Sequence, residues 1–406
     1  MQLSLFNTPT PKEKPQIQLL ELFEAYFSCR SNKRNTANAL AFEVDYEHNL
    51  VQLCHEINNS TYQQNRSIAF IVNKPVKREI FAADFRDRIV HHLIFNKLNP
   101  LFEKAFINDS YACRTDKGTH FGIKRINKFI RQCSLNYTKD CYILKLDLKG
   151  FFMHINKNIL FEKLSIFINQ KYIETDKELL LELCYKIIFN DPTQNCIIKG
   201  KRKNWDNLPN DKSLFYSAHQ SGLPIGNLTS QVFANFYMNT FDHHIKHDLN
   251  IRFYGRYVDD FVIINPDKDY LKSLIPHLSN FLLSTLKLTL HPKKIYLQHY
   301  SKGVQFLGTI IKPHRIYIAN RTKGNFYNAI EKQSRIARDH KPSKEEQAAF
   351  LSSVNSYLGI MKHYKTYNLR KRMINKNLSA WWWNYAFSTG GLSKFVLKSK
   401  PSKFKN

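Results

Sequence analysis

Two adjacent carboxylates, Asp259 and Asp260, are the residues whose type and spacing point most directly to chemistry. Apolar, β-prone runs flank them, Phe253-Tyr254 before and residues 261–264 after, which predicts a hairpin with acid at its tip. Because two crowded like charges are costly, a cation must neutralise them, and hard oxygen ligands suit Mg²⁺. A solvated turn is the simpler interpretation of such a pair taken alone.

A third carboxylate, Asp147, ends a predicted strand over residues 142–148. The apolar side chains of that strand share one face, and Asp147 points to the other face with Lys145. Separate strands of one sheet can bring Asp147 beside Asp259 and Asp260. Three carboxylates can hold two Mg²⁺ ions roughly 4 Å apart, one on an attacking and one on a leaving oxygen, which is the chemistry of nucleotidyl transfer. A cap at a strand end is the alternative role for Asp147.

The charge of the chain is strongly basic and unevenly distributed. Its 406 residues include 61 Lys and Arg against 33 Asp and Glu, a net charge of +28. Residues 312–406 alone hold 20 Lys and Arg against 4 Asp and Glu, a net +16. Such an excess predicts a polyanionic partner, nucleic acid before all others, although a solvated basic surface is the alternative.

Cysteine usage and hydropathy predict a reduced compartment and no membrane. The seven cysteines are scattered and include no CxxC pair, so we expect neither a disulfide framework nor a zinc site. No run of about 18 apolar residues is present, and the first 14 residues contain no apolar signal-peptide core. The sequence therefore predicts a cytoplasmic protein.

Apolar periodicity predicts three consecutive regions. These are an N-terminal helical extension (1–64), a mixed helix-and-strand region (65–315) interrupted by a polar insertion loop (191–220), and a basic helical region with a tail (316–406). In the last region Ser343 has the form of a capping-box residue. Three consecutive tryptophans, Trp381–Trp383, cannot all face one core on a helix, so we expect at least one to be exposed.

Three motifs in a fixed order carry a family resemblance. They are Leu146-Asp147-x-x-x-Phe151-Phe152, then Gly222–Gln231 (GLPIGNLTSQ), then Tyr257-Val258-Asp259-Asp260. With them the chain resembles a bacterial reverse transcriptase of the retron and group II intron lineage over roughly residues 65 to 370. The resemblance implies an α+β right-hand polymerase fold: fingers and a palm with an antiparallel sheet over 65–315, and a helical thumb over 316–406.

The resemblance also assigns a metal site. It implies that Asp147, Asp259 and Asp260, with the backbone carbonyl of Leu148, bind two Mg²⁺ ions, for which Mn²⁺ can substitute. Lys294 matches a lysine that protonates the leaving pyrophosphate; a solvated lysine is the alternative.

Further roles follow by resemblance for the incoming dNTP and the primer. Arg78 matches the fingers arginine that contacts the triphosphate, and Lys74 assists it. Phe152 matches the aromatic gate that excludes a ribose 2′-hydroxyl, which disfavours an RNA-dependent RNA polymerase; core packing is its alternative role. The primer-grip hairpin is matched by Phe306, Leu307 and Gly308.

Residues Ile225 to Gln231 separate this chain from many group II intron relatives. Where those carry Gln and Pro, this chain has Ile225 and Gln231, as in reverse transcriptases of diversity-generating retroelements. Gly226 permits close backbone approach to a nucleotide, and Gln231 can contact the templating pair, although helix capping is an alternative for this segment. Members of that branch copy a template RNA with errors at adenines. Because Ile225 cannot form the hydrogen bonds of a glutamine beside the nascent base pair, we expect the geometry of that pair to be checked less strictly.

The combined prediction is an RNA-directed DNA polymerase that makes cDNA from dNTPs on a dedicated non-coding RNA. The setting is a diversity-generating retroelement or an anti-phage defence system, with an accessory protein or a second reverse transcriptase as a possible partner. Two alternatives stay open: a template-independent or protein-primed DNA polymerase of a defence system, and a non-catalytic RNA-binding scaffold.

Overall fold

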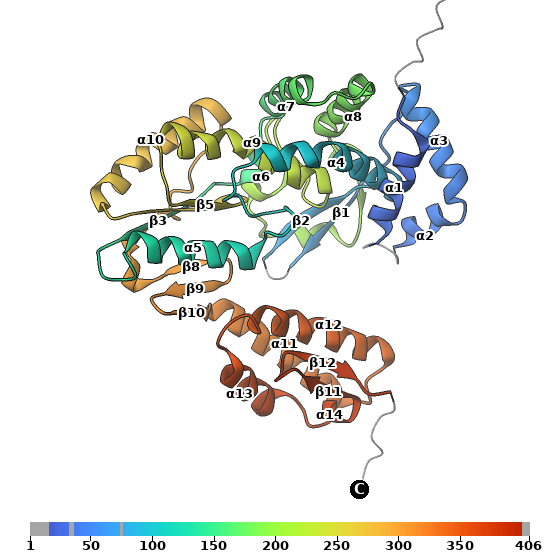
Figure 1. Ribbon diagram of the computed structural model, residues 1–406. Coiled ribbons are helices and arrows are strands. Elements are labelled where there is room, and N and C mark those ends of the chain that lie inside the picture. Colours follow the sequence, from blue (N-terminus) through green and yellow to red (C-terminus); the bar gives the residue numbers. More distant parts are fainter. Residues whose placement is uncertain (1–15, 32–35, 74–75, 400–406) are drawn as a thin grey trace, which may run out of the picture. The chain divides into compact units, whose positions relative to one another are not determined.

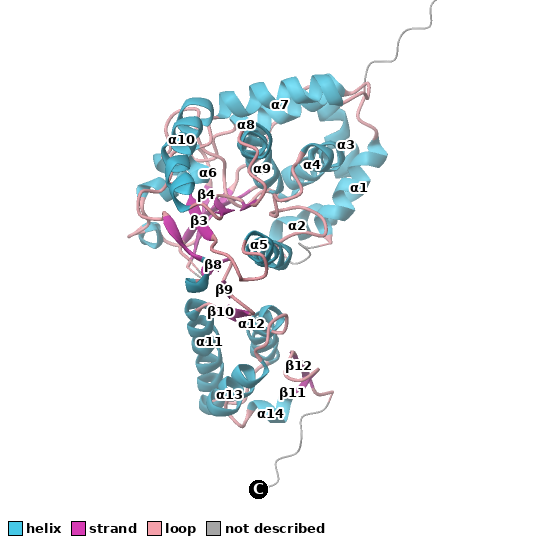
Figure 2. Cartoon of the chain, turned by 60° about the vertical axis from the view of Figure 1, so that its left-hand side comes forward, coloured by secondary structure: helices cyan, strands magenta, loops and turns pink. Residues whose placement is uncertain are grey.

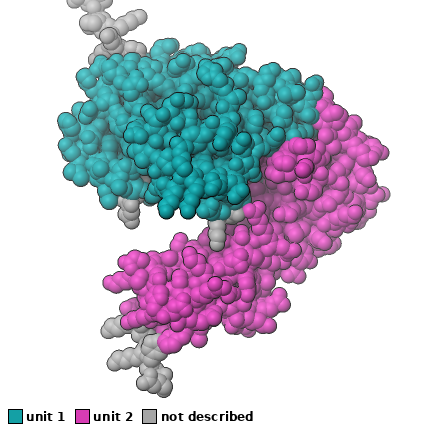
Figure 3. All heavy atoms as spheres, turned by 180° about the vertical axis from the view of Figure 1, so that it is seen from behind, with its two compact units in different colours: residues 1–113, 148–250, 278–290 teal, residues 114–147, 251–277, 291–406 magenta. Residues whose placement is uncertain are grey.

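The computed structural model describes residues 16–31, 36–73 and 76–399, and the chain divides into two compact units made of interleaved segments. Unit 1 comprises residues 1–113, 148–250 and 278–290; unit 2 comprises residues 114–147, 251–277 and 291–406 (Figure 3). The fingers, palm and thumb expected from the sequence follow one another along the chain, whereas each compact unit combines several separate segments. The boundaries of fingers, palm and thumb stay a prediction. Among the described residues, no helix combines the length and apolar character needed to cross a bilayer.

Unit 1 is mostly helical and holds one small sheet with strand order β2-β1-β4 (Figure 1). Its elements are α1 (Leu19–Arg30), α2 (Ala37–Glu43), α3 (Tyr46–Asn58), β1 (Ile68–Val72), β2 (Arg78–Ala82), α4 (Phe85–Ala105), α6 (Phe151–His154), α7 (Lys157–Lys171), α8 (Lys177–Phe189), β4 (Ile197–Ile198), the 3₁₀ turns η1 (Arg202–Trp205), η2 (Asn210–Lys212) and η3 (Leu214–Tyr216), α9 (Leu228–His243) and the π-helical turn η4 (His244–Asp248). Helix α10 (Lys268–Leu286) has residues in both units.

Unit 2 contains the larger sheet, with strand order β5-β6-β3-β7. Its C-terminal part is mainly helical (Figure 2). Its elements are α5 (Thr119–Cys133), β3 (Tyr142–Asp147), β5 (Tyr254–Tyr257), β6 (Asp260–Asn265), β7 (Tyr296–His299), η5 (Tyr300–Lys302), β8 (Val304–Phe306), β9 (Thr309–Lys312), β10 (Arg315–Ile318), α11 (Asn320–Asp339), α12 (Lys344–Met361), α13 (Tyr367–Asn377), α14 (Trp382–Tyr385), β11 (Ala386–Thr389) and β12 (Lys394–Leu397). The predicted hairpin with acid at its tip is confirmed as β5–β6.

Local sequence explains several element boundaries. The hydroxyl of Ser343 accepts from the backbone N–H of Glu346, whose carboxylate accepts from the N–H of Ser343, so the predicted capping box is confirmed at the start of α12. Helix α5 buries Ile123, Ile126 and other apolar residues on one face and exposes basic residues on the other.

The C-terminal part packs around one tryptophan. Trp382 is fully buried, stacks on Phe350 with ring centroids 4.0 Å apart, and donates from Nε1 to the carbonyl of Gln333 at 2.8 Å. Trp381 is 46% exposed, which confirms that the three tryptophans do not share one core. The sequence analysis expected helices alone here, and it missed the hairpin β11–β12.

Candidate active site

Strand pairing in unit 2 places two of the three predicted metal ligands directly opposite each other. Asp147 ends β3 and pairs in register with Asp260, which begins β6. Because directly opposed residues share a face of the sheet, both carboxylates belong to the same face, with Lys145 two residues before Asp147. Asp259 precedes Asp260 in the turn between β5 and β6.

The turn that carries Asp259 is strained. Val258 has φ +58°, a left-handed conformation that a β-branched residue rarely adopts. Arg256, fully buried in β5, donates from Nη1 to the carbonyl of Val258 at 2.8 Å and thereby supports this backbone from inside the strand. Sequence reasoning missed Arg256; its position between the aromatic residues of the motif offered no signal of burial.

Two ammonium groups lie against these carboxylates. Lys294 Nζ is 2.9 Å from Oδ1 and 3.0 Å from Oδ2 of Asp147, and Lys145 Nζ is 3.1 Å from Oδ2 of Asp260. Lys294 was predicted for this site. Lys145 was predicted only to share a face with Asp147, and its two-residue spacing in a strand was the available signal for its role as a counter-ion.

The electrostatics of Asp260 favour an additional cation. Burial raises the pKa of Asp260 to about 7; Lys145 acts in the opposite direction, whereas the charges of Asp259 and Asp147 raise the pKa further. Its Oδ1 atom is buried and has no hydrogen-bond partner within the described part of the chain. A buried acceptor with this surplus of negative neighbours is stabilised by a positive ion.

The donor set fits Mg²⁺ in kind, because it consists of carboxylate oxygens. Within residues 16–31, 36–73 and 76–399, no group of three or more His, Cys, Asp or Glu side chains converges closely enough to hold an ion. Convergence of Asp147, Asp259 and Asp260 on metal therefore stays a prediction, as does the carbonyl ligand from Leu148.

Unit 1 brings together several residues predicted to contact the nucleotide. Phe152 and Ile225 pack against one apolar cluster that includes Phe81 of β2. The carbonyl of Ile225 accepts from the N–H of Phe81 at 2.8 Å, and the carbonyl of Phe152 accepts from the N–H of Leu223 at 2.8 Å. The loop before α9 is thus fixed onto β2 and α6.

Gly226 is required by this close approach. It has φ +133°, and a Cβ at this position would lie 2.9 Å from Ile80 Cγ2 and 3.0 Å from the carbonyl oxygen of Phe81. Arg78 begins β2 and is exposed. Lys74 lies outside the described residues.

The polar residues around the start of α9 have structural partners. Asn227 does not cap the helix: its Oδ1 accepts from the N–H of Ala83 at 3.0 Å. Thr229 is buried with its hydroxyl 2.6 Å from His91 Nδ1, and burial lowers the pKa of His91 to about 3, so that histidine is neutral. Gln231 is exposed, with Oε1 2.9 Å from Cys113 Sγ.

The predicted primer-grip segment forms a tight hairpin. Leu307 and Gly308, with φ +47° and +81°, connect β8 to β9, as a two-residue turn with two positive φ angles requires. Phe306 is fully buried, and the carbonyl of Gly308 accepts from the N–H of Ala319 at 3.0 Å. The hairpin is confirmed, and contact with a primer stays a prediction.

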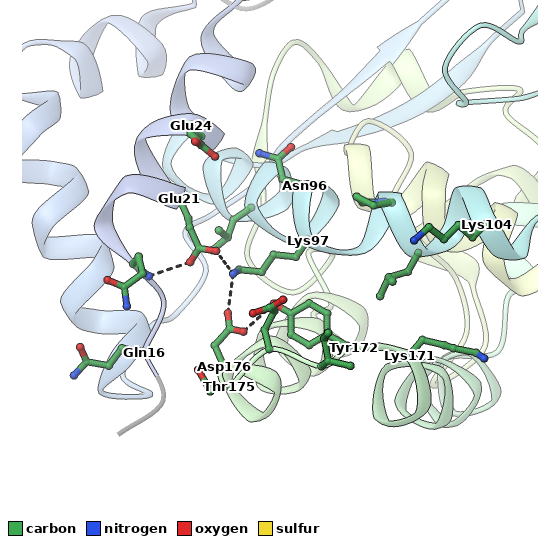
Figure 4. A pocket seen from close by; sticks show the side chains of 16 residues that line it. Gln16, Glu21, Glu24, Asn96, Lys97, Lys104, Lys171, Tyr172, Thr175 and Asp176 are labelled. Carbon is green, nitrogen blue, oxygen red and sulfur yellow. Dashed lines mark hydrogen bonds and ion pairs between the residues drawn. The ribbon is translucent and has the colours of Figure 1, made fainter. Parts of the chain in front are cut away.

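A separate pocket in unit 1 contains compensated charges (Figure 4). Lys97 lies against both Glu21 of α1 and Asp176, with 2.7 Å from its Nζ to Oδ2 of Asp176. Tyr172 donates to Oδ1 of Asp176 at 2.8 Å. None of the described residues that were predicted for the chemistry lines this cavity of about 640 Å³. Its charges join α1 to α4 and the start of α8.

Comparison with known proteins defines the class. Residues 73–311 match the family model described as "Reverse transcriptase (RNA-dependent DNA polymerase)". The chain belongs to the reverse transcriptase family, a family of nucleotidyltransferase enzymes, and its mixture of helices and sheets is the α+β fold of these polymerases. The finer assignment to the diversity-generating or retron branch is not part of this match.

Individual relatives are distant. Protein YkfC of Escherichia coli (strain K12) is 22% identical over 255 residues, which cover 55% of this chain and 60% of YkfC. Similar solved structures include apo telomerase from Candida tropicalis (14% identity, TM-score 0.48, 76% of this chain and 60% of that chain). Another is telomerase from Candida albicans in complex with a fragment of telomeric RNA (12% identity, TM-score 0.46, 79% and 57%). The chain therefore spans about three-fifths of the length of these proteins, and no residue role is taken from them.

Proposed function

We propose that this chain is an RNA-directed DNA polymerase that copies a dedicated non-coding RNA into cDNA from dNTPs. One observation carries the proposal: Asp147 and Asp260 stand opposite each other on neighbouring strands, with Asp259 beside them in a strained turn. All three lie inside the segment that matches the reverse transcriptase family.

In this proposal the carboxylates of Asp147, Asp259 and Asp260, with the carbonyl of Leu148, hold two Mg²⁺ ions, or Mn²⁺ in their place. When bound, these ions activate the primer 3′-hydroxyl and neutralise charge on the leaving pyrophosphate. In the same proposal Lys294, whose ammonium group lies beside Asp147, donates a proton to the leaving group.

Selection of the nucleotide is assigned to unit 1. Phe152, packed against the apolar cluster that includes Phe81, presents an aromatic ring whose bulk excludes a 2′-hydroxyl. Arg78 offers an exposed guanidinium for a triphosphate, and Lys74 a second cation. The fixed loop at Gly226 and the exposed amide of Gln231 form a surface for the templating base pair.

Primer extension tests the proposal. The purified chain is given an RNA template of defined sequence, an annealed DNA primer and all four dNTPs or rNTPs, and the product is sequenced. Complementary DNA from dNTPs is expected, with no product from Asp259→Asn. Product unrelated to the template would favour a template-independent or protein-primed polymerase, and loss of all synthesis with retained RNA binding would favour a scaffold.

The biological setting rests on the sequence of Ile225 to Gln231, which favours a diversity-generating element over a mobile intron; anti-phage defence is the second setting. Sequencing the RNA and new DNA that co-purify with the chain distinguishes them. A copy of a repeat mutated at adenines supports diversification, whereas a short repetitive product supports defence. The same purification identifies an accessory protein or a second reverse transcriptase.

A further inference from the structure

A continuous basic groove lies within unit 2 along α5. Three hollows of about 690, 610 and 790 Å³ adjoin one another, because the first two share Arg131 and Asn136 and the last two share Arg315 and Lys365. Their walls come from α5 and the loop after it, the two residues before β5, the β9–β10 turn and β10, Lys323 of α11, the segment between α12 and α13, and the start of α13. We call this feature the α5 groove.

The α5 groove is lined by cations without acids. Lys124, Lys128 and Arg131 are exposed and recur at helical spacing, so they form one stripe about 10 Å long on α5. Arg315 and Lys365 continue the charge beyond the helix. Among the described residues, none that lines the three hollows is Asp or Glu.

The wall of the groove includes a strained turn. Leu135, Asn136 and Tyr137 have φ angles of +47°, +58° and +71°, three successive left-handed residues without a glycine. Each such residue costs roughly 1 kcal/mol, and strain of this kind persists where the surrounding structure imposes it. The ring of Tyr137 is held edge-on to His314 at 4.6 Å and stacked on Tyr300 at 5.7 Å between centroids.

The strained turn of the α5 groove lies away from the carboxylates. The strained turn precedes the first residue of β3, Tyr142, whereas Asp147 is its last residue. A strand of this length spans about 17 Å between those ends. Tyr300, which stacks on Tyr137, follows the strand β7 at the same end, because His299 pairs with Tyr142.

We propose that the α5 groove, whose strained turn lies at the opposite end of β3 from Asp147, binds the backbone of a double-stranded RNA stem. Phosphate recognition requires closely spaced Lys and Arg, with amides and hydroxyls able to reach 2′-hydroxyl groups, as Asn127, Asn136 and Tyr364 can here. A protein partner is disfavoured, because lysine is depleted and apolar surface enriched at the centre of protein interfaces. The inference does not depend on the proposed catalysis.

Binding to an occupied polymerase tests the groove. The full chain is first loaded with a template–primer whose primer is chain-terminated, together with the next dNTP. A fluorescent RNA hairpin with a stem of about 16 base pairs is then titrated into this complex. The triple variant Lys124→Gln, Lys128→Gln and Arg131→Gln is compared with a control of equal charge loss, Lys302→Gln, Arg338→Gln and Lys344→Gln; these three control positions are exposed and do not line the groove. Glutamine maintains helix propensity in α5.

We expect the groove variant to bind the hairpin roughly 10- to 100-fold more weakly, the control to change little, and primer extension to proceed at the wild-type rate in both. Equal hairpin affinity in variant and wild type would overturn the proposal. A loss of primer extension as large as the loss of hairpin affinity would also overturn it, because the groove would then be part of the template–primer path. Tighter binding of a DNA duplex, or of polyglutamate, would overturn the assignment to RNA. If the wild type extends no primer, the proposed function fails, while hairpin binding still tests the groove.

Discussion

The two ends of the four-stranded sheet in unit 2 carry opposite charges. At the end of β3 that bears Asp147, carboxylates outnumber the lysines against them, and a buried oxygen of Asp260 has no hydrogen-bond partner among the described residues. At the other end, cations line the α5 groove without an acidic residue. In the two proposals, small cations complete the first end and a polyanion binds at the second. Catalysis and RNA binding would then lie at opposite ends of a single strand.

Removing one carboxylate at the acidic end is expected to produce the largest effect. Asp260→Asn leaves Asp147 with fewer metal-binding neighbours, and we expect DNA synthesis to fall by at least about 1,000-fold, or roughly 4 kcal/mol in the barrier. Hairpin affinity is expected to stay at the wild-type value. Primer-extension rates and fluorescence titration measure the two quantities.

The same substitution at the opposite end provides the control. Asp140 lies just before β3, and its side chain is 80% exposed. Asp140→Asn should change the rate of synthesis by less than about threefold. A comparable loss from both substitutions would mean that the sheet tolerates neither change, and the separation of its ends would not stand.

In a third charged region, the pocket of unit 1, the charges are neutralised by other side chains of the same chain. Lys97 is nearly buried between Glu21 and Asp176, so its removal leaves two carboxylates without their cation. We expect Lys97→Met to lower the free energy of unfolding by about 3 kcal/mol, measured by denaturant titration. The rate of primer extension at low temperature should be unchanged. Lys104→Met, at an exposed lysine of the same pocket, is the matched control and should cost less than about 1 kcal/mol.

Local patterns allowed much of this structure to be predicted. The β5–β6 hairpin and the cap at Ser343 follow from alternation and from a short motif, and both are confirmed. The hairpin β11–β12 was missed because its strands are only four residues long and follow a helical tryptophan run. The turn at Leu135–Tyr137 contains no glycine or proline from which its left-handed backbone could be predicted.

The candidate site could be predicted only in part, for a different reason. The order of the motifs led to Asp147, Asp259 and Asp260, but only the strand register shows that Asp147 and Asp260 are opposite neighbours. The support of Val258 by Arg256 depends on burial, which pairing and packing decide and spacing does not. Residues whose role depends on a packing partner were therefore missed, whereas residues within short sequence motifs were found.

The strained turn at the basic end predicts a smaller effect. Leu135 has φ +47° and is 61% exposed, so glycine at this position should relieve backbone strain with little lost packing. We expect Leu135→Gly to be more stable than Leu135→Ala by roughly 1 kcal/mol, because alanine keeps the Cβ. If the turn holds the groove wall in place for RNA, the glycine variant should nevertheless bind the hairpin less tightly than the alanine variant. Thermal unfolding and the titration above measure both; equal hairpin affinity would assign the strain no role in binding.

The smallest effect concerns pH at the N-terminal end of α5, where His120 contacts Tyr364 of the α5 groove. Burial lowers the pKa of His120 below its usual value, and the neighbouring charges of His363, Lys124 and Lys362 lower it further; its Nδ1 is 3.0 Å from the hydroxyl of Tyr364. Phosphates in the groove would oppose that repulsion and raise the pKa of His120 in the complex. Proton uptake then accompanies binding, so hairpin affinity should rise about two- to threefold as the pH falls from about 7.5 to about 6.

Folding responds to the same histidine in the opposite direction. The native state binds fewer protons than the unfolded chain when the pKa is lowered, so the contribution of His120 to stability is lost as pH falls through about 6.5. His120→Asn should flatten the pH dependence of hairpin affinity, whereas His219→Asn, on an exposed loop of unit 1, should leave it intact. Affinity that does not change with pH in the wild type would show that phosphates do not approach this end of α5.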